Sequence, residues 1–157
     1  MSTTRDNASA KKVVTHVAAQ AITATNTPAA GVDTQGFDSV SFLISVGTVT
    51  NIANSPQPSW KFHIEESDAE GSGFAAILDA SRILVGGSKS PVTEPDPASG
   101  VFLTVDNAAE DATTYHVGVI TSNRYVRVVA TAANTPGSTP YSVVAVLEGA
   151  SVQPVIN

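Results

Sequence analysis

The three histidines are the residues best suited to metal binding or proton transfer in this sequence. His16, His63 and His116 each lie in a different stretch of alternating residues, and none has a second histidine at the spacing of an HxH or HExxH motif. A metal site normally shows such a local ligand pair, so we predict that the protein has no metal site. Single histidines on separate strands are more typical of hydrogen-bonding partners.

A second candidate is the acidic run over residues 65–70. It contains Glu65, Glu66, Asp68 and Glu70, whose carboxylates are the kind of oxygen ligand that calcium prefers. The run lacks the D-x-[DN]-x-[DN]-G pattern of an EF-hand loop, and clustered charges usually face solvent. We therefore expect a solvated acidic turn between strands, and calcium binding by this turn stays open as the alternative.

The other catalytic motifs are incomplete. Gly86–Ser90 is rich in glycine and serine but lacks the G-x-x-x-x-G-K-[ST] frame of a phosphate loop, and no serine lies in a G-x-S-x-G elbow. The chain has no cysteine, which excludes disulfides, thiolate metal sites and cysteine nucleophiles. We therefore predict that the protein is not an enzyme and that it has no catalytic residues and no cofactor.

The segment Arg124–Arg127 is the remaining candidate site. Tyr125 and Arg127 fall on the same face of a predicted strand, and tyrosine and arginine often anchor binding interfaces. In one interpretation these two side chains bind a protein or sugar partner. In the other, the arginines lay their aliphatic stems on the sheet near a turn and keep their charge in water. The sequence leaves both interpretations open.

Alternating residues dominate the elements that must position these side chains. Residues 39–46, 60–65 and 141–147 have apolar side chains at every second position, which is typical of strands with one buried face. The predicted buried residues are Val40, Phe42, Ile44, Val46, Trp60, Phe62, Ile64, Tyr141, Val143, Ala145 and Leu147. Residues 47–59 and 86–100 are predicted to be long loops. The pattern predicts an all-β protein, either an antiparallel β-sandwich or a partly closed, jelly-roll-like barrel.

The stretch Tyr115–Thr131 is predicted to organise this domain. Its apolar positions on one face of each of two short strands are Tyr115, Val117, Val119, Val126, Val128 and Ala130. Four polar residues at 121–124 separate the two runs, and Asn123 tolerates the positive φ that a hairpin turn often needs. We therefore predict a β-hairpin with a tight turn inside a two-layer protein.

The length of 157 residues predicts one domain. We expect a flexible N-terminal arm at residues 1–11 and a single β-domain at residues 12–157, with an extended tail from about residue 148. The tail contains Val152, Val155 and Ile156, and apolar residues on an exposed tail tend to mark contacts. We expect the tail to pack across a subunit boundary, against a sister copy or a partner protein.

The charge of the chain argues against several classes of partner. Charged residues make up 14% of the sequence, which is well below the usual quarter or so. The formal net charge of −6 argues against a nucleic-acid-binding surface. No apolar run approaches the ~18 residues of a membrane span, and the polar N-terminus has no secretory signal. We therefore expect no nucleic acid and no membrane among the partners.

The order of several short motifs carries a family resemblance. The motifs are AITAT at 21–25, VDTQGFDSVSF at 32–42, WKFHIEESD at 60–68, NRYVR at 123–127, YSVVAVL at 141–147 and QPV at 153–155. Taken in this order, they resemble a group of small virion proteins of tailed bacteriophages that are found alongside the major capsid protein. The resemblance covers roughly residues 20–155, and the order of the motifs carries it.

The resemblance implies a structural protein of the virion. It implies a capsid decoration or cement protein that coats the outside of the head, binds the major capsid protein and acts as a homo-oligomer, with a trimer at local three-fold positions favoured. Such a protein is made in the cytoplasm of the host bacterium and ends up on the capsid surface. A neck or tail position in the same virion is the alternative within this class.

A second resemblance leads to a different function. The strand motif Arg-Tyr-Val-Arg is similar to a signature of discoidin-like and carbohydrate-binding sandwiches, which present aromatic side chains to sugars. This alternative predicts that aromatic residues beside Arg127 are exposed to solvent, with Trp60, Tyr125 and Tyr141 as the candidates.

Overall fold

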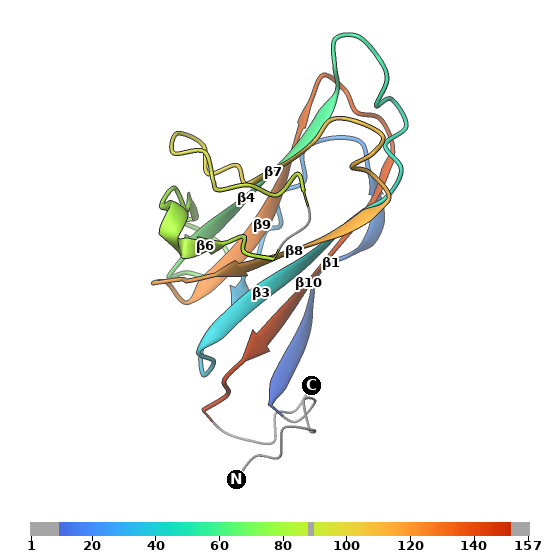
Figure 1. The fold of residues 1–157 in the computed structure, drawn as a ribbon. Coiled ribbons are helices and arrows are strands. Elements are labelled where there is room, and N and C mark those ends of the chain that lie inside the picture. The colour runs from blue at the N-terminus through green and yellow to red at the C-terminus, as the bar shows by residue number, and fades with distance from the viewer. Residues whose placement is uncertain (1–9, 88–89, 152–157) are drawn as a thin grey trace.

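The chain folds almost entirely into β-strands, which confirms the predicted fold class (Figure 1). The computed structural model describes residues 10–87 and 90–151. The strands are β1 (Lys11–Ile22), β2 (Val32–Asp33), β3 (Ser39–Val46), β4 (Ser59–Ser67), β5 (Ala75–Ala76), β6 (Ile83–Leu84), β7 (Leu103–Val105), β8 (Thr113–Val119), β9 (Tyr125–Ala133) and β10 (Thr139–Glu148), and a 3-10 helix, η1 (Ala80–Arg82), precedes β6.

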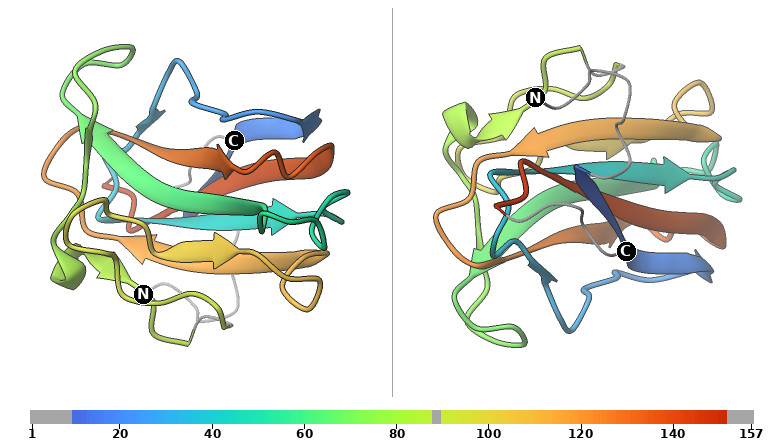
Figure 2. Two further views of the ribbon diagram at one scale, coloured as in Figure 1. Left: turned by 90° about the horizontal axis from the view of Figure 1, so that it is seen from above. Right: turned by 90° about the horizontal axis from the view of Figure 1, so that it is seen from below.

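Two antiparallel sheets pack against each other and do not close into a barrel, so the structure selects the sandwich from the two predicted architectures. Sheet A has the strand order β1-β10-β3-β8-β6. Sheet B has the order β2-β9-β4-β5, and β7 also pairs with β4. The first and last long strands, β1 and β10, lie side by side at one edge of sheet A, as the views in Figures 1 and 2 show.

The core lies between the sheets and consists of the residues that alternation predicted. Each inward-facing position of β3, β4 and β10 in the predicted set is buried. Trp60 is fully buried, and its indole N–H donates a hydrogen bond of 2.9 Å to the hydroxyl of Thr139, which is buried as well. A buried indole N–H needs such an acceptor, so this bond fixes β4 against the start of β10 across the two sheets.

The predicted hairpin over Tyr115–Thr131 is wrong. Both of its strands form, but β8 pairs with β3 and β6 in sheet A, whereas β9 pairs with β2 and β4 in sheet B. Residues 120–124 therefore cross from one sheet to the other. The period-two pattern requires only that one face of each strand is buried. Two strands that face each other across a core satisfy it as well as two paired strands do.

The long loops contribute to the core as well as to the surface. Val49 in the first loop and Phe102 at the end of the second are buried. The backbone N–H of Val49 donates to a carboxylate oxygen of Asp111 at 2.9 Å, and that of Phe102 donates to the carbonyl of Phe62 at 3.1 Å. These bonds tie the first loop to the residues that precede β8, and the residue that follows the second loop to β4.

His16 connects the two sheets at the β1 edge. β9 is paired with β2 at Val126 and with Asn26 at Ala130, so the N–H of Val128 between them has no strand partner on that side. The Nε2 atom of His16, which belongs to β1 of sheet A, accepts this N–H at 3.1 Å. Burial lowers the pKa of His16 from 6.5 to about 4, so the ring is neutral at pH 7 and can accept.

Candidate functional site

The outward-facing side chains of sheet A form an almost uncharged surface, which we call the outer face of sheet A. The strand register places one row across all five strands of the sheet. That row consists of Val13, Val146, Ser41, Gly118 and Leu84. The next row contains Thr15, Val144, Leu43 and His116. Apart from His116, small, aliphatic and hydroxyl side chains therefore make up these two rows, the first of which is five strands wide.

Charge is confined to one end of this face. Among the described outward-facing residues of the paired strands, the ionised side chains are Lys11 and Glu148, which lie opposite each other and form an ion pair at 2.5 Å. The exposed fractions of the large apolar side chains are 57% for Val13, 38% for Leu43 and 49% for Leu84. The sequence has 8 lysine and arginine residues and 14 aspartate and glutamate residues, so most of its charged residues lie outside this face. The outer face of sheet A is thus suited to contact with protein.

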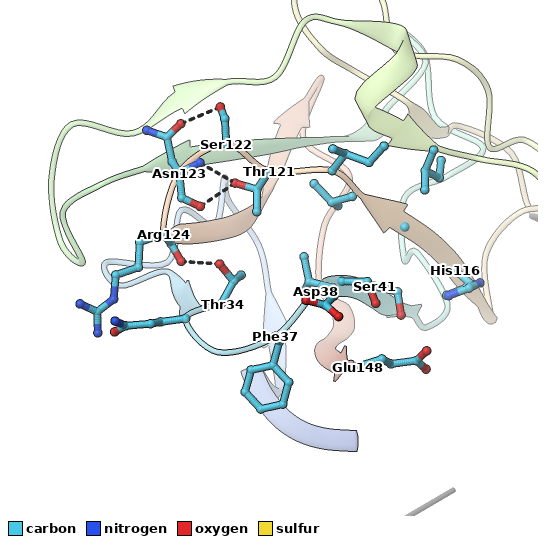
Figure 3. Close-up of a pocket in the computed structure, with 17 residues that line it drawn as sticks. Thr34, Phe37, Asp38, Ser41, His116, Thr121, Ser122, Asn123, Arg124 and Glu148 are labelled. Carbon is cyan, nitrogen blue, oxygen red and sulfur yellow. Dashed lines mark hydrogen bonds between the residues drawn. The ribbon is translucent and has the colours of Figure 1, made fainter. Parts of the chain in front are cut away.

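An open groove of about 660 Å³ lies at the end of this face. Its floor comes from β3, β8 and β6, and its walls come from residues 34–38 and 120–124. Figure 3 shows Ser122 and Asn123 on one wall, with Phe37 and Glu148 on the opposite side. Gly118 belongs to the floor, and a Cβ atom there would lie 3.2 Å from the Cβ of Leu84, so the glycine leaves room for the leucine.

A half-buried carboxylate, that of Glu66, holds the wall formed by residues 120–124. Glu66 at the end of β4 forms an ion pair with Arg82, accepts the hydroxyl of Thr121 at 2.9 Å and accepts the backbone N–H of Ser122 at 3.2 Å. Burial alone would raise the pKa of Glu66, but these hydrogen bonds outweigh it and hold the pKa below its ordinary value. The crossover between the sheets therefore has a fixed conformation.

The opposite end of the groove is tied to the same crossover. The N–H and the hydroxyl of Thr34 both donate to the carbonyl of Arg124, at 2.9 and 2.8 Å. The guanidinium of Arg124 donates two hydrogen bonds to Asp33, at 3.0 and 2.7 Å, and holds the pKa of that carboxyl below its usual range. Residues 33–34 and 121–124 therefore form one connected rim.

The candidate anchors Tyr125 and Arg127 lie on sheet B, away from this groove. Arg127 forms an ion pair with Glu65 at 2.6 Å, donates to the carbonyl of Pro28 at 2.7 Å and lies over the ring of Phe74 at 3.9 Å. Arg127 is therefore engaged by contacts within the chain, and its charge is paired with Glu65 and not kept in water. Tyr125 is partly exposed.

The prediction of a solvated turn at residues 65–70 is wrong for its first two residues. Glu65 and Glu66 belong to β4 and point to opposite faces, where they pair with Arg127 and Arg82. The run could not show this, because the two arginines lie far away in the sequence. Across residues 10–87 and 90–151 the structure contains no group of three or more histidine, aspartate or glutamate side chains arranged to hold a metal ion.

Two of the aromatic residues required by the carbohydrate alternative lie in the core. Trp60 and Tyr141 are buried between the sheets, and the ring of Tyr141 lies 5.9 Å from that of Phe62. The prediction that they are exposed is wrong, because both occupy inward-facing positions. Neither side chain is therefore available to stack on a sugar at the surface.

The first residues of the tail, which is predicted to begin at about residue 148, form hydrogen bonds within the domain. Glu148 is the last residue of β10, and its carbonyl accepts the N–H of Asp38 at 3.0 Å. The N–H of Ser151 donates to the carbonyl of Gly36 at 2.9 Å. Residues 148–151 are thus bonded to the loop at residues 36–38 of the same chain, and the contacts expected across a subunit boundary stay a prediction. Val152, Val155 and Ile156 lie outside the described residues, as do residues 1–9 of the arm predicted at residues 1–11, whereas Lys11 is the first residue of β1.

A second groove, on the outer face of sheet B, has a volume of about 770 Å³ and a more polar lining. Lys61 and His63 of β4 face Glu94 and Asp96 of the long loop there. Two backbone N–H groups, those of Ala98 and Ser99, donate to Asp96 and lower its pKa. One of the charged residues of this groove, Asp96, is thus engaged within the chain, and Pro95, Pro97 and Val101 are the apolar residues of its lining.

Comparison with known proteins identifies no relative: no family model, no curated protein and no solved structure matches the chain. In the part of the chain that the structure describes, no helix is long and apolar enough to cross a membrane. The sequence predicts neither the groove nor the exposure of Leu43 and Leu84 on one face. The signal that could have shown them is the absence of Lys, Arg, Asp and Glu at the outward-facing positions of β3, β6 and β8.

Proposed function

We propose that the chain is a structural protein of a tailed-phage virion, a capsid decoration or cement protein that binds the outer surface of the head. The observation that carries this proposal is the outer face of sheet A. It is five strands wide, and its ionised side chains are restricted to the Lys11–Glu148 pair among the described strand residues. The ordered motifs that resemble small virion proteins support the same class of function.

Physical chemistry favours a protein partner for this face. Burying apolar surface contributes roughly 25 cal/mol per Å², and Leu43 and Leu84 keep 38% and 49% of their surface exposed. Exposed apolar side chains that gather on one face mark interaction sites, whereas scattered ones do not. A neutral face also lets a protein with a net charge of −6 approach a partner without strong repulsion at the contact.

The partner in this proposal is the major capsid protein. Each contact can be weak, because many identical sites on the shell act together and a homo-oligomer that engages several of them gains avidity. A trimer at local three-fold positions matches this arrangement. By adding buried area between capsid subunits, the protein would help the shell to resist internal pressure.

A substitution on the outer face of sheet A tests the proposal. Leu43→Asp places a charge at the centre of the face and should weaken binding to purified heads that lack this protein by tenfold or more, measured by co-sedimentation. The matched control is Leu78→Asp, because Leu78 is 44% exposed but precedes η1 and lies outside the strands of this face. Circular dichroism checks that both variants fold.

The outcomes separate the alternatives. Equal binding by the Leu43→Asp variant and the unaltered protein would show that this face does not contact the shell. Finding the protein in purified tails and not in heads would assign it to the neck or tail of the virion. Loss of binding in both variants would show that the effect is not specific to this face.

A further inference from the structure

The groove in sheet A brings two carboxylates next to apolar side chains. Asp38 and Glu148 both line it, and the N–H of Asp38 donates to the carbonyl of Glu148 at 3.0 Å, so the two residues are neighbours at one end of the sheet. Figure 3 shows Asp38, Ser41 and Glu148 on the same side of the groove. Leu84 and Ile120 also line it and are 49% and 52% exposed. The groove therefore offers negative charge together with uncovered apolar surface.

The described residues of the lining do not balance this negative charge. Arg124 lines the groove, but its guanidinium donates two hydrogen bonds to Asp33, which is not part of the lining. Glu148 is paired with Lys11, and such exposed ion pairs contribute little to stability. Asp38 is exposed and takes part in none of the ion pairs among the described residues. The carboxylate of Asp38 is therefore available to a cation.

The free carboxylate and the apolar surface lie one strand apart. Val40 of β3 pairs with Val119 of β8 at one end of sheet A. Asp38 precedes β3 and Ile120 follows β8 at this same end. Because neighbouring strands lie about 4.8 Å apart, a lysine or arginine side chain can rest its methylene stem on Ile120 and place its charge at Asp38. A phosphate or carboxylate ligand would instead meet the like charges of Asp38 and Glu148.

We propose that this groove binds a lysine or arginine side chain of a partner protein. Its volume of about 660 Å³ is in the range of ligand pockets and leaves room for the residues on either side of the basic one. Ser39, Ser41 and Asn123 supply polar groups that can bond the backbone of such a segment. Hydrogen bonds within the chain hold both walls, at Thr34 and at Ser122, so binding requires little ordering of the groove.

The groove adds recognition of charge to the apolar contact that the outer face of sheet A can make. A partner that covers this face and carries a basic residue at the groove is favoured over one that does not. The net charge of −6 also attracts a basic partner over a longer range. The proposal does not depend on the proposed function, because any protein with an exposed basic segment can carry the residue.

Methyl NMR of the isolated full-length protein tests the proposal. The probes are the blocked peptide acetyl-Gly-Ala-Lys-Ala-Gly-amide and its arginine counterpart, titrated to millimolar concentration. Both should shift the signals of Leu84 and Ile120 in a saturable manner and leave those of Leu78 unchanged. The control peptide has norleucine at the centre, which keeps the stem without the amine, and should bind at least about fivefold more weakly. Free 1,4-diaminobutane, which supplies the amine without a peptide, should also bind more weakly than the lysine peptide.

Two variants of the full chain locate the charge that is recognised. Asp38→Asn removes the carboxylate with little change in shape and should weaken binding of the lysine peptide by about fivefold. Asp68→Asn is the matched control, because Asp68 is exposed in the turn that follows β4 of sheet B, and it should leave the affinity unchanged. The methyl spectrum of each variant without peptide checks that it is folded.

Several results would overturn the proposal. They are the absence of shifts with both basic peptides, equally tight binding of the norleucine peptide, and equal losses of affinity in Asp38→Asn and Asp68→Asn. Binding of 1,4-diaminobutane that is as tight as that of the lysine peptide would show a site for free amines and would overturn the assignment to a protein partner.

Discussion

The bond between His16 and Val128 makes the stability of the sandwich depend on pH. The structure favours a neutral ring at this position, because burial disfavours the charged form of His16 and the Arg127 guanidinium nearby adds to this. The neutral Nε2 accepts the backbone N–H of Val128 at 3.1 Å. The unfolded chain has no such requirement, so its histidine titrates at the ordinary value of 6.5. The two states therefore bind different numbers of protons over one range of pH.

The sign and size of the effect follow from linkage. Above pH 6.5 neither state binds a proton at His16, and the full stability is present. As the pH falls from 6.5 to about 4 the unfolded state binds more protons, so the free energy of unfolding decreases. One pKa unit corresponds to about 1.4 kcal/mol, and the lowering from 6.5 to about 4 thus amounts to about 3 kcal/mol. Below pH 4 both states are protonated and the loss is complete.

The assay compares urea unfolding of the protein with that of His16→Gln between pH 7.5 and 4. Glutamine does not titrate, but its amide oxygen can accept a hydrogen bond. Carboxylates such as Asp33 and Glu66, whose pKa values are also lowered, titrate in both proteins and cancel in the difference. We expect the stability difference to shift by about 3 kcal/mol in favour of the variant as the pH falls. A difference that stays constant over this range would refute the reasoning.

Two further substitutions test the polar groups of the core. Thr139→Val removes the acceptor of the buried Trp60 N–H and should lower the free energy of unfolding, measured in urea, by about 1–3 kcal/mol. The control Thr139→Ser keeps a hydroxyl and should retain most of the stability. No loss of stability in the valine variant would contradict the role of this bond. Tyr141→Phe removes a buried hydroxyl that has no hydrogen-bond partner among the described residues. Thermal unfolding of this variant should therefore show equal or slightly higher stability. A loss of more than about 1 kcal/mol would show that the hydroxyl is hydrogen-bonded.

The sequence by itself determined which residues are strands and which face of each strand is buried. Alternation at residues 39–46, 60–65 and 141–147 identified the inward-facing side chains, because a strand with one face in a core must repeat with a period of two. The turn Asp79–Arg82 was also predictable, since Asp79 accepts the N–H of Ser81 as a local cap. These features depend on neighbours within a few residues.

Only the tertiary structure decided which strands pair and what the polar residues do. Period two is the same for a hairpin and for two strands in opposite sheets, so the assignment of β8 to sheet A and β9 to sheet B lay beyond the pattern. Glu65 and Glu66 found partners at Arg127 and Arg82, 62 and 16 positions away. The outer face of sheet A and its groove join side chains from five strands. Such contacts depend on the register of distant segments, and no local pattern in the chain records that register.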